Sequence, residues 1–209
     1  MNNKRILVGC ISVGIFLFMM TGIISFGKIS SIGNKTREIN ENLTPNLEYL
    51  GVLNGDVSGI PRLVSDLVLE TNEQRMKDLE SEIKLLLRKI DEDSKDYQIM
   101  ITSYEEKELY NEFEKNWNIY LEKLPAIIED GKANKFDSAN KKIVAAYPFW
   151  KNANDKLAEL ITVNKNRIDE ISSQALTLQQ TIIVDILVAI LIGNIVCFVY
   201  LIDILRKKE

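Results

Sequence analysis

The sequence contains no histidine, and its two cysteines, Cys10 and Cys197, both lie in long apolar runs near the chain ends. The lack of histidine removes the side chain that most often serves as a general base or a metal ligand. Because both cysteines lie in the apolar runs, the polar middle of the chain can form no internal disulfide. We also find no nucleophile–base triad, phosphate-binding loop or metal-ligand cluster. We therefore expect no catalytic residue, no metal site and no cofactor.

The sequence also lacks strand signals, since no stretch alternates apolar and polar residues with a period of two. Apolar residues instead recur with the 3-4 spacing of amphipathic helices, in four long runs. The second run misses one core position, which is occupied by Asp93. In the fourth run the predicted core positions include Ile143, Trp150 and Ile161. We predict an all-α protein.

The breaks between these runs carry helix-boundary signals. Ser103 and Glu106 have the spacing of a capping box, which predicts a helix start near residue 104. Gly131 is expected to stop the third helix, and Asn134 or Asp137 to cap the fourth. The first and fourth helices are about 65–70 Å long and the middle two about 45 Å, at 1.5 Å per residue. These lengths predict an antiparallel up-down-up-down four-helix bundle flanked by two transmembrane helices.

Two long apolar runs predict membrane spans. Residues 6–26 contain no charge over 21 residues, and residues 186–202 form an uncharged core of 17 residues. Lys4 and Arg5 precede the first run, and residues 206–208 are basic, so both termini are expected in the cytoplasm. The predicted segments are a cytoplasmic N-terminus (1–5), transmembrane helix 1 (6–27), an extracytoplasmic bundle (28–181), transmembrane helix 2 (182–205) and a cytoplasmic end (206–209).

The charge balance concerns possible partners. The chain has 30 acidic and 26 basic residues and a formal net charge of −4. A nucleic-acid-binding protein would instead present an excess of Lys and Arg to the phosphate backbone. We therefore expect the lipid bilayer as a partner and no nucleic acid.

A family resemblance adds to this interpretation. A first span continues into a helix containing "NLTPNLEYL", and "YEEKELYNEFEKNWNIYLEKLPAIIEDGKANKFDSANKKIV" precedes a second span. This arrangement resembles the four-helix-bundle sensory module of methyl-accepting chemotaxis proteins, over about residues 1–205. The helix junction with Gly131, Phe136, Asp137 and Ala139 fits the loose pattern of that family.

The resemblance implies a homodimer in the bacterial inner membrane with the bundle outside the cytoplasm. It also implies a small-molecule or periplasmic or extracellular protein ligand, and a signal that leaves through the second span. Such receptors continue into a signalling domain, whereas this sequence stops at "LRKKE". The chain is then either a fragment or a stand-alone sensor that acts through a partner.

A candidate ligand site lies near two prolines. Pro61 and Pro148 are each predicted about 16–21 Å below the distal tip of the bundle, at nearly the same height. Prolines bend helices, and cationic and aromatic residues beside such bends can form a pocket. Trp150 also fits the core pattern, so a purely structural role stays open. The candidate ligand-binding residues are Arg62, Asp66, Tyr147, Phe149, Trp150 and Lys151.

Two groups of small residues predict helix contacts. Gly51, Gly55 and Gly59 recur every four residues, nearly opposite the core stripe of the first helix. They are interpreted as a dimer face, with a locally broken helix as the alternative. In the second span, Ala189, Gly193 and Asn194 predict transmembrane packing, because a buried amide needs a partner.

We therefore expect a sensory input module of a chemoreceptor-type transducer, without enzymatic activity. The alternative is a two-span structural or regulatory protein that dimerises with other membrane receptors and binds no small ligand.

Overall fold

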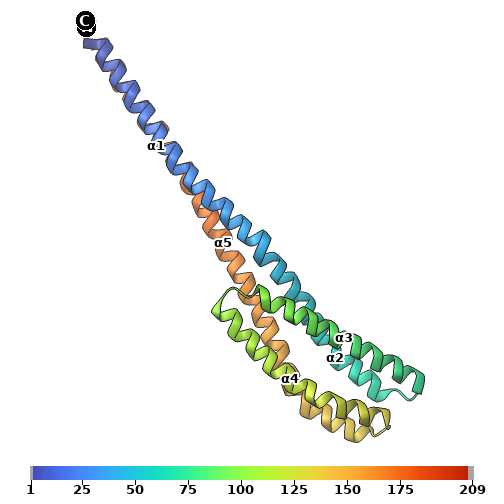
Figure 1. Ribbon diagram of the computed structural model, residues 1–209. Helices are drawn as coiled ribbons and strands as arrows, with labels where there is room; N and C mark the ends of the chain where they lie inside the picture. The colour runs from blue at the N-terminus through green and yellow to red at the C-terminus, as the bar shows by residue number, and fades with distance from the viewer. Residues whose placement is uncertain (1, 207–209) are drawn as a thin grey trace. The chain divides into compact units, whose positions relative to one another are not determined.

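The computed structural model describes residues 2–206, and every regular element among them is a helix (Figure 1). This confirms the predicted all-α fold. The chain divides into two compact units. We call residues 40–168 the bundle, and residues 2–39 with 169–206 the arm pair. The elements are α1 (Asn2–Glu38), a π-helix (Ile39–Leu43), α2 (Thr44–Leu69), α3 (Glu73–Met100), α4 (Tyr104–Lys132) and α5 (Phe136–Arg206).

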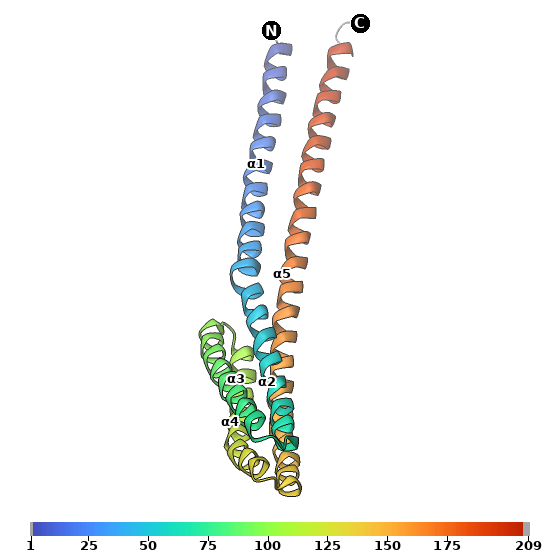
Figure 2. The ribbon, with the colours of Figure 1, turned by 90° about the vertical axis from the view of Figure 1, so that its right-hand side faces the viewer.

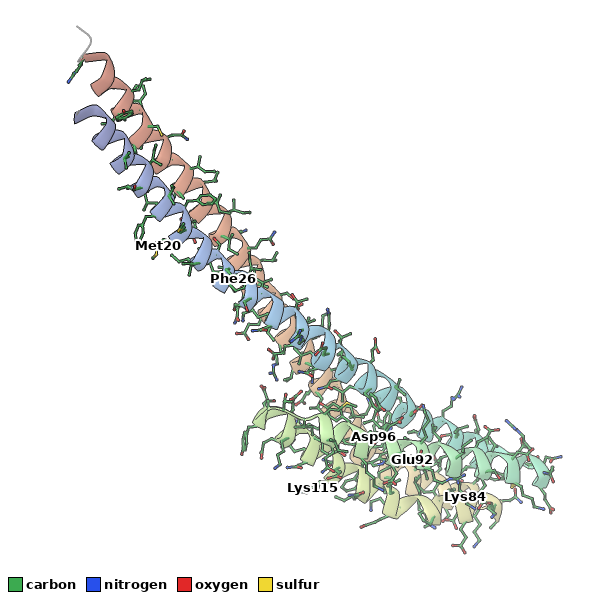
Figure 3. All side chains as sticks on the ribbon, turned by 45° about the horizontal axis from the view of Figure 1, so that its top comes forward. Met20, Phe26, Lys84, Glu92, Asp96 and Lys115 are labelled. Carbon is green, nitrogen blue, oxygen red and sulfur yellow. The ribbon has the colours of Figure 1, made fainter. Side chains whose placement is uncertain are left out.

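Neighbouring helices of the bundle run antiparallel. Tyr49 of α2 bonds Asp96 of α3, and seven residues further along α2 Asp56 pairs with Lys89, which lies seven residues earlier in α3. α2 and α3 therefore run in opposite directions. On the other side of the bundle, Lys156 of α5 pairs with Glu112 of α4 at 3.0 Å. In Figure 3, Glu92 and Asp96 lie on α3 and Lys115 on α4, among the polar side chains that cover the bundle.

The bundle core contains large side chains from α2, α3 and α4. Five aromatic rings form a continuous row, with neighbouring ring centroids 5.4–6.4 Å apart. Such pairs add to the stabilisation from buried apolar area. The ring members are Tyr97, Tyr110, Phe113, Trp117 and Tyr120.

The core of α5 differs from the prediction. Its fully buried positions include Ala139 and Ala146, which the apolar pattern did not select, whereas the predicted Ile143 and Trp150 are only half-buried. The apolar pattern gave too much weight to large residues. Alanines at the centre let α5 approach the large side chains of the other helices closely.

Two helix boundaries show where the sequence signals succeed and fail. Ser103 and Glu106 form the predicted capping box, each side chain accepting a hydrogen bond from the backbone N–H of the other residue. The prediction that Gly131 stops a helix is wrong, because α4 continues to Lys132. A Cβ at Gly131 would lie 2.9 Å from Leu67 Cδ2 and 3.2 Å from Val68 Cα. Glycine is therefore required there by the close approach of α2.

The turn after α4 uses different residues from those predicted. Asn134 has a positive φ of 52°, so it forms the left-handed turn residue and does not cap α5. The first backbone bond of α5 runs from the Ala139 N–H to the Lys135 carbonyl. Asp130 fastens the turn by accepting hydrogen bonds from Ser138 Oγ and Lys142 Nζ.

A π-helix precedes α2 for a local reason. Pro45 lies in the first turn of α2 and has no N–H to donate to the carbonyl four residues earlier. A widened π turn is one way in which a helix accommodates such a residue.

The arm pair contains α1 and the C-terminal part of α5, which Figure 2 shows side by side. Both helices have a stretch long and apolar enough to cross a membrane. Their apolar side chains are largely exposed, with Phe18 at 78% and Phe198 at 63% of full exposure. Met20 and Phe26 likewise project outward from α1 (Figure 3). An exposed apolar surface of this extent is typical of lipid contact.

Candidate functional site

The structure brings three of the residues beside the predicted bends together. Pro61 of α2 and Tyr147 and Trp150 of α5 line one small hollow of about 20 Å³. A volume of this size holds about one water molecule. Tyr147 packs against Trp150 with ring centroids 5.4 Å apart. In this structure the layer is closed, and a ligand would enter only if the helices moved.

Trp150 has a specific structural partner. Because Pro61 lacks an N–H, the carbonyl of Val57, four residues earlier, loses its usual helical donor. Trp150 Nε1 donates a hydrogen bond to this carbonyl oxygen at 3.1 Å. The indole of α5 therefore replaces the backbone donor that the proline of α2 removes. This bond joins α5 to α2 one turn before Pro61.

The other candidate ligand residues surround this layer without lining the hollow. Arg62 and Asp66 are exposed on α2. Lys151 forms an ion pair with Asp155 one turn further along α5, which raises the pKa of Lys151. Phe149 lies under the ammonium of Lys123, 5.1 Å from nitrogen to ring centroid. The six-residue ligand site stays a prediction.

The three glycines of the predicted dimer face do not share one environment. A Cβ at Gly51 or Gly55 would meet no heavy atom within 4 Å, so both glycines face open space. At Gly59 a Cβ would lie 3.4 Å from Leu86 Cδ2, which places this residue beside α3. α2 continues unbroken through all three, which disfavours the broken-helix alternative. The open part of the face therefore comprises Gly51 and Gly55.

The predicted packing residues of the second span line a hollow in the arm pair. Ala189, Gly193 and Asn194 face α1 across this hollow. A Cβ at Gly193 would meet no heavy atom within 4 Å, so this glycine does not bring the two helices into close contact. Contact with another span stays a prediction.

Sequence reasoning missed an ion pair in the arm pair. Lys28 Nζ lies 2.5 Å from Asp185 Oδ2. Lys35 Nζ also donates to Gln174. The sequence could have indicated this pair. Lys28 lies just after the first apolar run and Asp185 directly precedes the second, so both lie on the bundle side of the runs.

Buried polar groups concentrate near the α3–α4 turn. Tyr110 donates to the Ser94 carbonyl at 2.8 Å, and its hydroxyl also contacts Ser94 Oγ at 2.8 Å. Burial and the nearby Glu106 carboxylate raise the pKa of Tyr97 well above its usual range, and Asn164 opposes this shift. The Tyr110 hydroxyl therefore connects α4 to α3 through Ser94.

α3 contains an acidic segment, residues 91–93, whose two aspartates form ion pairs with lysines of the same helix. Lys89 contacts Asp56 at 2.6 Å and Asp93 at 3.9 Å. Burial, followed by the neighbouring carboxylates, raises the pKa of Asp93, while Lys89 opposes the shift. Among the residues described, no group of three or more acidic or sulfur ligands could hold a metal ion.

Comparisons with known proteins agree with this architecture. Residues 3–178 match the family described as a four helix bundle sensory module for signal transduction. A Bacillus subtilis (strain 168) protein, YvaQ, named as a sensory transducer, is 21% identical over 151 residues. The match covers 72% of this chain and 27% of that protein, so the chain spans about a quarter of its relative's length.

The all-helical fold and the family match define the class of protein. It is a sensory helical bundle for signal transduction, in a chain with membrane-length helices. The chain belongs to the four-helix-bundle sensory module family. This is a signal-transduction family and not a known enzyme family. With two membrane-length apolar helices, membership identifies a two-pass membrane protein.

Proposed function

We propose that this chain is the non-catalytic input module of a chemoreceptor-type transducer and that α5 transmits its signal. The observation that carries the proposal is the continuity of α5, a single helix of 71 residues. Its N-terminal part supplies buried residues to the bundle, and its C-terminal part is one of the two membrane-length segments. A displacement of α5 at the bundle would therefore reach residue 206 without passing through a loop.

The proposed location is the bacterial inner membrane, with both termini in the cytoplasm and the bundle outside. The basic residues at the two chain ends support this orientation. The Lys28–Asp185 pair supports it as well, because it joins the polar ends of both apolar segments on the bundle side of the sequence. Cysteine at the exposed Lys77 should react with a membrane-impermeant maleimide in intact cells, and reaction only after lysis would reverse the orientation.

The proposed stimulus acts at the layer where Trp150 bonds the Val57 carbonyl. A small molecule or a periplasmic or extracellular protein would open this layer, with the Arg62 guanidinium and the Asp66 carboxylate at its edge. The hydrogen bond from Trp150 to the Val57 carbonyl supports this proposal, because it replaces the donor that Pro61 removes from α2. Opening that bond would remove one of the hydrogen bonds between α2 and α5, another being from Ser58 Oγ to Asn154 Oδ1.

The ligand proposal is tested by a thermal-shift screen of the full chain in lipid nanodiscs. A metabolite that binds this layer should raise the unfolding midpoint of the bundle, and Arg62→Ala should abolish the shift. Lys115→Ala, an exposed lysine on α4, is the matched control and should leave the shift intact. Equal shifts in both variants would place the site elsewhere.

The proposed assembly is a homodimer with α2 at the interface. Open space at Gly51 and Gly55 supports a close approach by a second α2. In a chain with Cys10→Ala and Cys197→Ala, Gly55→Cys should form a disulfide with its symmetry mate in membranes. Lys115→Cys provides the control, and equal cross-linking at both positions would reject this interface.

The alternative is a two-span regulatory protein that dimerises with other membrane receptors and binds no ligand. The small size of the hollow beside Pro61, about 20 Å³, favours it. A screen without any stabilising molecule, together with Gly55 cross-linking to a different receptor, would support this alternative.

A further inference from the structure

The arm pair contains an elongated hollow of about 660 Å³ between α1 and α5. One face of each helix lines it, from Ile11 to Ser25 on α1 and from Ile186 to Tyr200 on α5. Small residues alternate with large apolar ones along both faces. A Cβ added at Gly14 would meet no heavy atom within 4 Å. The glycines of this interface therefore leave space between the two helices.

The dimensions of the hollow decide what kind of molecule fits. Each lining face spans 14 residue steps, or about 21 Å at 1.5 Å per residue. The volume divided by this length gives a mean cross-section of about 30 Å². An α-helix with its side chains has a diameter of about 10–12 Å, hence a cross-section of roughly 80–110 Å². This enclosed space is narrower than a packed helix and has room for a slender apolar chain.

Polar groups show where the occupant would be anchored. Ser25 is 93% buried, and its Oγ, which faces the hollow, has no hydrogen-bond partner. A hydroxyl without a partner in apolar surroundings is costly. Ser25 lies one turn from Lys28, whose ion pair with Asp185 marks the polar end of the arms. An amphiphile entering between the helices would place its head group at this end.

A second polar group lies deeper in the hollow. Asn194 lines it and has an exposed side chain. Counting from the Lys28–Asp185 pair, the Asn194 amide lies about 9 Å further along the axis than Ser25. An amide at this depth makes this part of the hollow more polar than the rest of its lining.

We infer that the hollow binds a single-chain lipophile of the fatty-acid or long-chain-alcohol type. Its head-group oxygen contacts Ser25 Oγ, and its hydrocarbon chain extends past Asn194 toward Ile11 and Tyr200. The inference rests on the proposed membrane location of the arm pair. It gives the module a second, membrane-facing input, because an occupant between α1 and α5 would oppose movement of one against the other.

Photo-labelling of the full chain in lipid nanodiscs tests this inference. The probe is a long-chain fatty acid with a diazirine near its methyl end, and a diazirine alkane without the carboxyl group serves for comparison. The expected adducts lie on the two lining faces. Ser25→Ala should reduce labelling by the fatty acid more than labelling by the alkane, because only the acid has an oxygen to bind the hydroxyl.

Glycine variants provide the matched controls. Gly193→Leu and Gly14→Leu fill the hollow, whereas Gly9→Leu adds the same side chain on α1 outside it, and none of the three has a neighbour to clash at Cβ. Fatty-acid labelling should fall at least about fivefold in the first two variants, because the added side chain overfills the site. It should be unchanged in the third.

Three results would overturn the inference. The first is equal labelling of Gly193→Leu and Gly9→Leu, and the second is adducts confined to residues outside the lining faces. The third is disulfide formation between two copies carrying Asn194→Cys, which would place a second span in the hollow. Each leaves the proposed function standing. Reaction of these arms with a membrane-impermeant maleimide would instead reject the membrane location itself.

Discussion

The bundle and the arm pair place large and small side chains in opposite positions. In the bundle the large rings of Phe113 and Tyr110 are fully buried and fill the space between helices. In the arm pair the large side chains, such as Phe18, project outward, and small residues such as Gly14 line the interface. In water, burial of apolar area drives helix association, whereas lipid removes that driving force. The two regions therefore require different substitutions to disrupt them.

The largest contrast is expected between two phenylalanines. Phe113→Ala should destabilise the bundle by about 3–5 kcal/mol, because it removes a fully buried ring and leaves a cavity. Phe18→Ala should leave the bundle's unfolding midpoint unchanged, since its ring is 78% exposed. Unfolding of both full-length variants in nanodiscs, followed by tryptophan fluorescence, makes the measurement. Similar midpoints would show that the row of rings does not support the bundle.

A second contrast involves two glycines on packed and open surfaces. Gly131→Ala should destabilise by about 1–3 kcal/mol, because the backbone of α2 at Val68 cannot yield easily. Gly55→Ala should stabilise an isolated protomer by up to about 1 kcal/mol through helix propensity. Thermal unfolding in detergent compares them. Stabilisation by both would mean that α2 and α4 are further apart than described.

These two glycines also show what sequence reasoning could and could not reach. The helical spacing of Leu53, Val57 and Ile60 was sufficient to predict the fold and the buried face of α2, because periodicity reports burial directly. Gly131 was misinterpreted because a glycine near a helix end can either end the helix or make room for a neighbouring helix. The sequence is the same in both cases. Only the position of α2 distinguishes these two roles.

The candidate site was less predictable for the same reason. The sequence placed Pro61 and Trp150 near one height, since a constant rise per residue is enough for that. It could not show that the indole bonds the Val57 carbonyl, which depends on the rotation of α5 about its own axis. The Lys28–Asp185 pair was missed because its members are far apart in sequence and lie on different helices.

A mutant cycle tests the Trp150 bond. Trp150→Phe should destabilise the bundle by about 1–2 kcal/mol, because the Val57 carbonyl is left without a donor. Pro61→Ala supplies a backbone N–H for that carbonyl, so Trp150→Phe should cost less in the Pro61→Ala background. The coupling is measured from the unfolding midpoints of the four proteins. Additive effects would contradict the proposed exchange of donors.

The smallest expected effects concern two carboxyl groups whose pKa values are shifted in opposite directions. Burial raises the pKa of Asp93, so its ionised form costs stability at neutral pH, and this cost disappears as the pH falls through the raised value. Asp93→Asn should therefore stabilise by about 0.5 kcal/mol at pH 7 and less in acid.

Glu80 is the matched control. Hydrogen bonds from Lys132 and Lys84 lower its pKa, so its contribution is present at neutral pH and is lost as the pH falls through that lowered value. Glu80→Gln should destabilise at pH 7, with a difference that shrinks in acid. The unfolding midpoints of both variants across pH 3–8 give the signs. The same sign for both would reject the assigned environments.

The central claim is that α5 is one helix from the bundle into the membrane, and a spin-label scan tests it most directly. Single labels at successive positions from 150 to 202, in nanodiscs, report accessibility to oxygen and to a water-soluble relaxation agent. A continuous α5 should give an unbroken period of 3.6 residues, with the water-soluble agent effective before residue 182 and oxygen effective at residues 186–202. Loss of the period between residues 169 and 185 would contradict a continuous signalling helix.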